Sequence, residues 1–151
     1  MSSRFTQPLF LVPLAHLDLA ADDKVSILMN PDFCFEVGHL GSEEQICVPL
    51  GFLTDLASVP RLLRWVVNPS GARISRAAVI HDLLYRSREM REKYNRKQAD
   101  AIMKDAMRAA GCSKAHSQIV YLALRLGGFF AWRSGGTKEI HELVLPASEL
   151  P

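Results

Sequence analysis

Four side chains at helical spacing define the chemistry that this sequence could perform. His81, Asp82 and Tyr85 lie in one apolar stretch, and Asp100 follows in the next one. His81 and Tyr85 are four residues apart, so they share a helix face, whereas Asp82 is rotated by about 100° from His81. A carboxylate that binds one imidazole nitrogen fixes the tautomer, and the other nitrogen can then take a proton from water. We therefore expect His81, Asp100 and Tyr85 to form a catalytic group.

Asp82 and Asp55 are the expected metal ligands. The segment around Asp55 and Ser58 mixes small polar and apolar residues. A loop of this kind can supply oxygen ligands beside a carboxylate to a divalent cation such as calcium or zinc. The cation would polarise a substrate carbonyl and stabilise an oxyanion.

The same residues also allow a purely structural interpretation. His81, Asp100 and Tyr85 can form a satisfied polar network that holds two helices together without catalysing a reaction. Asp55 would then cap a backbone turn or pair with Arg86. The sequence leaves both interpretations open.

Three helices in the second half of the chain must position these residues. Apolar residues at helical spacing predict a helix from Ser75 to about Met90. Asn95 and Gln98 form a capping box that opens a helix running to Ala110, and Ser113 opens a third helix to about Leu126. Helices with short connections lie roughly antiparallel. The inner stripe expected for the third helix is Ile119, Val120, Ala123, Leu124 and Leu126.

The first third of the chain predicts strands. Val25–Met29 is a compact apolar run, and Phe33–Val48 has the alternation and glycine-rich centre of a β-hairpin. Leu62–Val67 can form a short helix, and Ile140–Leu145 one strand before a loose end. The expected fold is α+β, with a small N-terminal antiparallel sheet packed on a three-helix unit. We expect one domain over residues 1–136, with its core at about 25–130, and a C-terminal tail over 137–151.

The cysteine count argues against a disulfide framework. The chain has 151 residues, of which 48% are hydrophobic, and three are cysteines. Because three is odd and no pair has C-x-x-C spacing, we expect small buried thiols in a reducing compartment. Cys34 and Cys47 could be neighbours across two strands, but the sequence does not require a bond between them.

Composition also limits the partners. A net charge of +2 gives no basic stripe of the kind that binds nucleic acid. No apolar run is long enough to span a bilayer. Phe129, Phe130 and Trp132 follow Gly127-Gly128, and they predict either a core edge or a contact with another protein.

Val48–Pro60 reads V-P-L-G-F-L-T-D-L-A-S-V-P. This string is similar to the signature V-P-x-G-F-x-T-D-x-A-S-V-P of a phage and prophage family, domain of unknown function 1353. Arg76–Tyr85, Ala99-Asp100 and Ala106-Met107 follow in the same order. The resemblance covers roughly Phe33 to Gly128. It implies a phage or prophage origin among tail or lysis functions, and it implies no known activity.

A more remote resemblance links the pair of helices to phospholipases A2. His81-Asp82-x-x-Tyr85, followed by a helix with Asp100, is similar to their paired catalytic helices. The resemblance implies that His81 is the general base, Asp82 a calcium ligand, and Tyr85 and Asp100 the residues that hold the histidine.

This sequence departs from phospholipases A2 at two places. The glycine-rich calcium loop is absent, so Thr54–Val59 would have to replace it. Ile80 and Leu84 stand where secreted members have cysteines.

The functional expectation is a small bacteriophage-encoded protein, associated with the virion or tail as a structural or assembly component, that has a phospholipase A2-like His-Asp site. The alternative is a metal-assisted hydrolase of a lipid or other ester, with His81 as base. Expected partners are other phage structural proteins or further copies of the chain. The expected location is the virion, after synthesis in the host cytoplasm. An accessory factor that acts in that cytoplasm is a third possibility.

Overall fold

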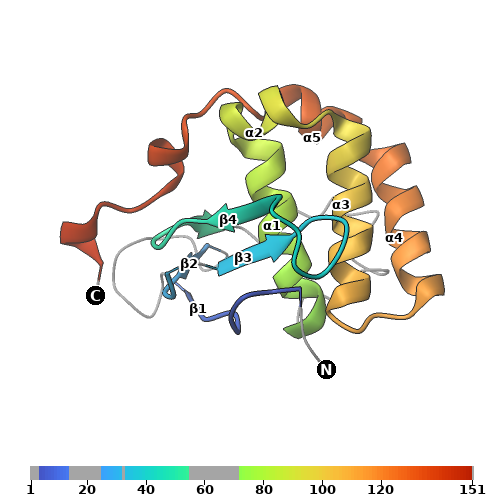
Figure 1. Cartoon of the computed structure of the whole chain (residues 1–151). Helices are drawn as coiled ribbons and strands as arrows, with labels where there is room; N and C mark the ends of the chain where they lie inside the picture. The colour runs from blue at the N-terminus through green and yellow to red at the C-terminus, as the bar shows by residue number, and fades with distance from the viewer. Residues whose placement is uncertain (1–3, 14–24, 32, 55–71, 151) are drawn as a thin grey trace.

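Strands from the N-terminal half pack against helices from the C-terminal half, so the predicted α+β class is confirmed (Figure 1). The structure is a computed structural model and describes residues 4–13, 25–31, 33–54 and 72–150. The short helix expected at Leu62–Val67 and the metal ligand expected at Asp55 lie outside the described residues.

Five strands in the described residues form two antiparallel sheets. The strands are Leu11–Pro13 (β1), Ser26–Leu28 (β2), Phe33–Glu36 (β3), Gln45–Val48 (β4) and Leu53–Thr54 (β5). One sheet has the order β1-β2-β5, and the other pairs β3 with β4. The strand predicted at Val25–Met29 and the hairpin predicted at Phe33–Val48 are both confirmed, although they belong to separate sheets.

The β3–β4 hairpin contains a disulfide that the sequence did not predict. On the hairpin face turned to the core, the side chains are at most 1% exposed; they are Phe33, Phe35, Ile46 and Val48. On the other face, Cys34 lies opposite Cys47, their Cα atoms are 4.0 Å apart, and the two are bonded. The prediction of free thiols is therefore wrong for this pair, because the strand register places them opposite each other. Cys112 is free and buried, as predicted.

The described residues form five α-helices, which are Ala72–Arg86 (α1), Arg88–Lys93 (α2), Arg96–Ala109 (α3), Lys114–Gly127 (α4) and Phe129–Ser134 (α5). The three long ones, α1, α3 and α4, form the predicted three-helix unit. Helices α1, α3 and α4 alternate in direction, and α3 lies between the other two (Figure 1). The capping box of Asn95 and Gln98 is present, and the Ser113 side chain caps α4, so these predictions are confirmed.

The first predicted helix is divided into two. Helix α1 ends at Arg86 instead of continuing to Met90. Ser87 is fully buried and its hydroxyl accepts a hydrogen bond from the Met90 backbone N–H, so it acts as the N-cap of α2. The polar residues from 88 to 93 are therefore helical, because a buried cap restarts the helix.

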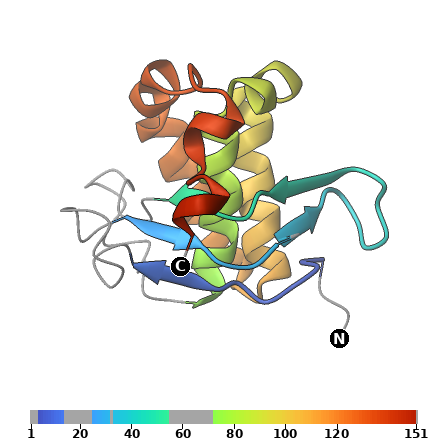
Figure 2. The same cartoon turned by 90° about the vertical axis from the view of Figure 1, so that its left-hand side faces the viewer.

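The C-terminal segment packs on the core. The strand predicted at Ile140–Leu145 is wrong, because Ile140–Leu143 is a 3-10 helix (η3), and Leu143 is fully buried. Lys138 bridges to Ser87 at the end of α1 and Val144 bridges to Phe52, so this segment runs from the α1–α2 junction toward the strands (Figure 2). The Leu145 N–H donates to the Gly51 carbonyl at 3.0 Å. Gly51 has a φ of +83°, and a Cβ there would lie 3.0 Å from the Leu145 oxygen, so this contact requires glycine.

Helix α4 buries fewer apolar residues than predicted. Val120 and Leu124 face the core with at most 7% exposure, but Ile119 is 48% exposed and Leu126 is 87% exposed. The prediction that both lie inside is wrong. Helix α4 packs mainly against α3, so one narrow stripe is enough for that contact and the opposite face is left uncovered.

Candidate functional site

One buried carboxylate, that of Asp100 on α3, joins three helices. Its side chain is 0% exposed. Its Oδ1 accepts a hydrogen bond of 2.5 Å from the Tyr85 hydroxyl and lies 3.2 Å from His81 Nε2, both on α1. Its Oδ2 accepts a hydrogen bond of 2.8 Å from Arg125 Nη1 on α4. The structure therefore brings together the three residues expected to form the catalytic group, and it adds Arg125.

The contact with Asp100 determines where His81 holds its proton. An ionised carboxylate can only accept hydrogen bonds, so this bonding assigns the proton of neutral His81 to Nε2 and leaves the free lone pair on Nδ1. The imidazole also packs on the Tyr85 ring, with centroids 4.1 Å apart and planes tilted by 39°. The His81 side chain keeps 13% exposure. Nδ1 is thus the atom of this group that can take a proton from a small molecule.

Asp100 is ionised at neutral pH in spite of its burial. Burial alone would raise the pKa of Asp100, but the hydrogen bonds from His81, Tyr85 and Arg125 outweigh it, and the net pKa lies below the usual value of 3.8. The pKa of Tyr85 is raised, first by burial and then by the bond to Asp100. Tyr85 therefore stays protonated and acts as a donor that holds the carboxylate.

Asp82 lies beside this group but has a different partner. Its carboxylate accepts a hydrogen bond of 2.9 Å from Arg86 Nη1, which also donates to the Leu53 carbonyl at 2.6 Å. Burial raises the pKa of Asp82, and the charge of Arg86 together with the hydrogen bonds from Thr54 and Arg86 offsets only part of the rise. The pKa values of Asp82 and Asp100 are thus shifted in opposite directions, a pattern found at sites where acids have different roles.

Among the described residues, a cationic side chain lies at Asp82, whereas the second expected metal ligand, Asp55, lies outside them. The Asp82 carboxylate and the Leu53 carbonyl both accept hydrogen bonds from Arg86. The guanidinium therefore occupies the position of a cation between them. The described part of the chain contains no cluster of three or more histidine, cysteine, aspartate or glutamate residues able to hold a metal.

A buried hydroxyl lies next to Asp82. Thr54 is fully buried beside Asp82, and its hydroxyl contributes to lowering the pKa of that carboxyl group.

Three residues of the site were missed by the sequence reasoning. Arg125 anchors Asp100 from α4, and Arg86 binds Asp82 within α1. Trp132 of α5 packs edge-on against Tyr85, with ring centroids 5.0 Å apart. The four-residue spacing of Asp82 and Arg86 was a signal that could have revealed that pair. Nothing local identifies Arg125 or Trp132, because helix packing brings them to the site.

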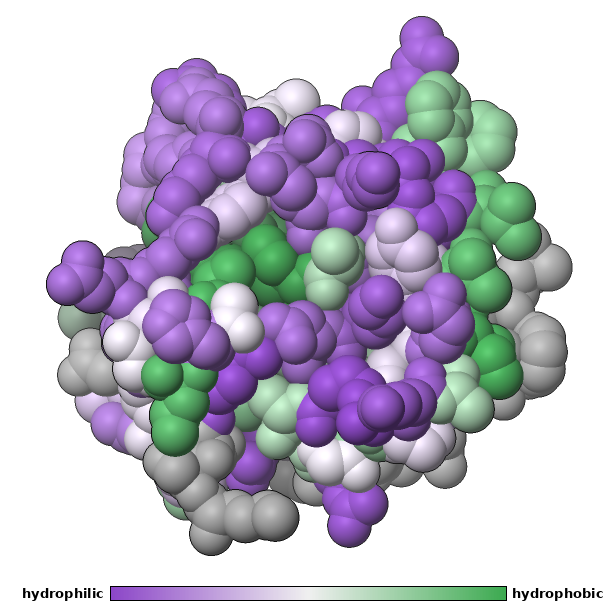
Figure 3. Space-filling model, turned by 45° about the vertical axis from the view of Figure 1, so that its right-hand side comes forward, coloured by the Kyte–Doolittle hydropathy of each residue, from purple (hydrophilic) through white to green (hydrophobic). Residues whose placement is uncertain are grey.

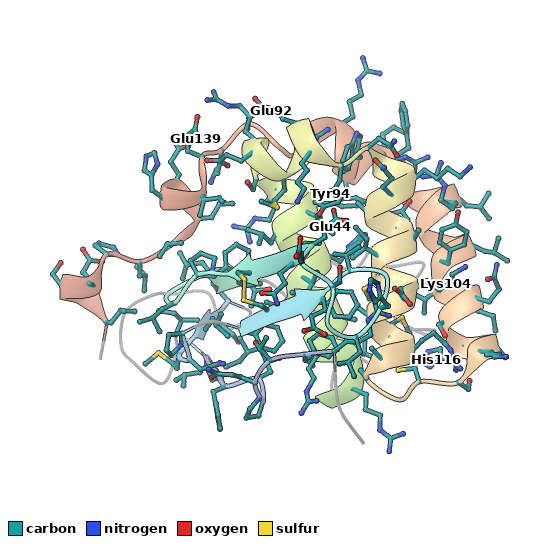
Figure 4. The ribbon with its side chains drawn as sticks, in the orientation of Figure 1. Glu44, Glu92, Tyr94, Lys104, His116 and Glu139 are labelled. Carbon is teal, nitrogen blue, oxygen red and sulfur yellow. A yellow bond between two sulfur atoms is a disulfide. The ribbon has the colours of Figure 1, made fainter. Side chains whose placement is uncertain are left out.

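A separate hollow lies between the hairpin and α3. It encloses about 440 Å³, and its apolar residues include Val37 and Ile102. Figure 3 shows hydrophobic atoms at its bottom and hydrophilic side chains around it. On its rim the Tyr94 hydroxyl donates to Glu44 at 2.6 Å, and Figure 4 shows these two side chains together. The face of α3 that lines this hollow is not the face that bears Asp100.

The chain matches the family described as "Protein of unknown function (DUF1353)" over residues 31–124. This range is more than half of the chain and includes the His81, Asp82, Tyr85 and Asp100 positions. The chain therefore belongs to this family, as its motifs indicated. No curated protein and no solved structure matches the chain.

The lengths and compositions of the described helices can be compared with those of a transmembrane segment. Within the described ranges, none of the helices has both the length and the apolar composition required to cross a bilayer.

Proposed function

We propose that the protein is a hydrolase of carboxylic esters in which His81 acts as general base. One observation supports the proposal above all others: a fully buried Asp100 holds the His81 ring through Nε2 and leaves Nδ1 free. Two further donors, Tyr85 and Arg125, keep Asp100 in place. A base needs this kind of fixed orientation, and a buried network of this kind supplies it.

The reaction follows from the position of the free lone pair. Nδ1 of His81 takes a proton from a water molecule while the water oxygen attacks the ester carbonyl carbon, which forms a tetrahedral oxyanion. The oxyanion then collapses, the bond to the alkoxide breaks, and the proton on Nδ1 passes to the leaving alkoxide. The products are a carboxylic acid and an alcohol. The Asp100 carboxylate stabilises the imidazolium that exists between the two proton transfers.

We assign to Arg86 the role of stabilising the negative charge that develops on the oxyanion. The resemblance to phospholipases A2 places a cation at Asp82, and in this chain a guanidinium is bound there. The Arg86 side chain is 32% exposed, so its guanidinium can be reached from solvent. No step in this proposal passes through a metal ion.

The test compares His81→Gln with the wild-type full-length chain. Glutamine keeps an N–H donor for Asp100 but has no basic nitrogen, so the network is retained and the base is lost. His39→Gln, at an exposed position in the hairpin loop, is the matched control. With p-nitrophenyl acetate and p-nitrophenyl octanoate as substrates, we expect kcat to fall by about 10²–10⁴-fold in His81→Gln only. A folded His81→Gln variant with wild-type rates, or wild-type protein with no activity above buffer, would overturn the proposal.

The second candidate is a structural or assembly component of a phage virion. It is favoured by the same network, because Asp100 links α1, α3 and α4 and would hold them together without any reaction. The Cys34–Cys47 disulfide supports a location outside the reducing cytosol, such as a released particle. Mass spectrometry of purified particles tests this candidate, and it fails if the protein stays in the lysate.

A further inference from the structure

Helix α4 is apolar on two opposite faces. Its inner face contains Val120 and Leu124, which are 1% and 7% exposed. At 100° per residue, the outer face about half a turn away contains Ile119, Leu122 and Leu126, which are 48%, 51% and 87% exposed. The described residues therefore leave the outer face of α4 uncovered.

The apolar surface continues into α5. Gly128 N–H donates to the Leu124 carbonyl at 2.8 Å and Trp132 N–H donates to the Gly128 carbonyl at 2.9 Å, so helical bonding passes through the glycine pair. Phe129 and Phe130 follow directly and are 49% and 80% exposed. We call Ile119, Leu122, Leu126, Phe129 and Phe130 the α4–α5 surface. Figure 3 brings the side of α4 forward and shows hydrophobic side chains along one edge of the molecule.

The charged residues in the segment that carries this surface all have the same sign. From residue 106 to residue 138 the sequence contains no aspartate or glutamate, and its basic residues are Arg108, Lys114, Arg125, Arg133 and Lys138. Lys114 at the start of α4 and Arg133 in α5 are exposed. Two copies of the chain that met through the α4–α5 surface would bring like charges together. The surface is instead complementary to a partner that is both apolar and anionic.

We propose that the α4–α5 surface binds the interface of an anionic lipid bilayer. The α4 and α5 helices lie in the plane of the headgroups, Leu126 and Phe130 enter the acyl region, and Lys114 and Arg133 contact lipid phosphates. Apolar side chains flanked only by basic ones are typical of helices that bind this interface. Leu126 and Phe130 are the most exposed of the five side chains, so they can enter a bilayer without any change of fold.

The α4–α5 surface belongs to helices that also support the His81 group, because α4 provides Arg125 to Asp100 and α5 packs Trp132 on Tyr85. We infer that the esters on which this group acts are those of the bound lipid. The lipid-ester part of this inference rests on the proposed hydrolase function, whereas bilayer binding does not. His81→Gln should therefore bind vesicles as wild type does, which separates failure of binding from failure of catalysis.

The experiment measures co-sedimentation of the full chain with phosphatidylcholine vesicles, with and without phosphatidylglycerol. We expect binding that requires phosphatidylglycerol and weakens with salt. Leu126→Ser with Phe130→Ser should weaken it by at least about tenfold, since each buried large apolar side chain contributes at least that factor. The matched control is Leu40→Ser, which removes a side chain that is 49% exposed on the hairpin loop, and it should bind normally.

A second variant keeps the test decisive if the double serine variant does not fold. Lys114→Glu with Arg133→Glu leaves the apolar residues in place and should abolish the preference for phosphatidylglycerol. The proposal is overturned if wild-type protein does not distinguish the two kinds of vesicle, or if both folded variants bind like wild type. It is also overturned if light scattering shows a stable wild-type dimer that Leu126→Ser converts to a monomer, since the surface would then be a contact between copies.

Discussion

Replacing Asp100 by asparagine is the sharpest perturbation of the site, because it preserves the shape of the side chain and removes its charge. The amide keeps one acceptor oxygen for His81 and Tyr85 and turns its NH₂ group toward Arg125, which is also a donor. The variant thus loses a charge-assisted bond worth about 1.5–3 kcal/mol, and its two other bonds weaken because the acceptor is neutral. With Arg125 30% exposed and able to reach water, we expect Asp100→Asn to be about 2–4 kcal/mol less stable at pH 7.

The pH dependence of this effect has a definite sign. The pKa of Asp100 is lower in the folded chain than its usual value of 3.8. Its ionisation therefore stabilises the fold above the unfolded-state pKa, and this contribution is lost as the pH falls through the folded-state pKa. The Asp100→Asn variant has no ionisable group at this position, so its stability contains no contribution of this kind that acid could remove. The stability gap between wild type and variant should be constant at neutral pH and should narrow in acid below about pH 4.

The assay is urea unfolding followed by circular dichroism at several pH values. The matched control is Asp105→Asn on the same helix, where the side chain is 40% exposed and pairs with Arg4 at 2.7 Å. Exposed pairs contribute about 0–1 kcal/mol, so this control should change little. The reasoning is refuted if both variants lose the same stability at pH 7, or if the Asp100→Asn gap stays constant in acid.

Three further predictions concern other parts of the fold. Cys34→Ser with Cys47→Ser should lower the free energy of unfolding by about 3 kcal/mol, because the bond closes a loop between residues 13 apart; equal stability of the two proteins in non-reducing buffer contradicts this. Leu143→Ala should cost about 2–5 kcal/mol in urea unfolding, since Leu143 is 0% exposed, and a neutral result would mean that the C-terminal segment is not docked. Calcium should give no Asp82-dependent heat in titration calorimetry, because Arg86 occupies the Asp82 carboxylate; heat that Asp82→Asn abolishes would restore a metal site.

Local signals in the sequence were sufficient for α3, α4 and the β3–β4 hairpin, but not for the C-terminal segment, where the strand predicted at Ile140–Leu145 is a 3-10 helix. The Asn95–Gln98 capping box, the Ser113 cap and the apolar periodicity predicted α3 and α4 closely, because helix starts depend on side-chain to backbone bonds within one turn. The alternation from Phe33 to Val48 predicted the hairpin for a similar reason. Ser87 was the exception, since its role as a cap depends on burial by distant parts of the chain.

The site was predictable where helix geometry alone determines a contact. His81 and Tyr85 share a face by spacing, and an acid on the apolar side of the next helix had to find a buried partner. The Asp100 contacts with both residues followed from this. The pairing of Asp82 with Arg86 was not predicted, because Asp82 was assigned to a cation and Arg86 was considered only as a partner of Asp55.

What the sequence by itself determined is therefore the position of α3 and α4, the β3–β4 hairpin, and the pairing of His81, Tyr85 and Asp100, because these depend on local bonding and on spacing along one or two elements. Only the tertiary structure decided the Cys34–Cys47 bond, the anchoring of Asp100 by Arg125, and the exposure of Leu126. Each of these depends on the register of two strands or on which face of a helix its neighbour covers. Periodicity shows that a helix face is apolar, but it does not show whether anything in the chain packs against that face.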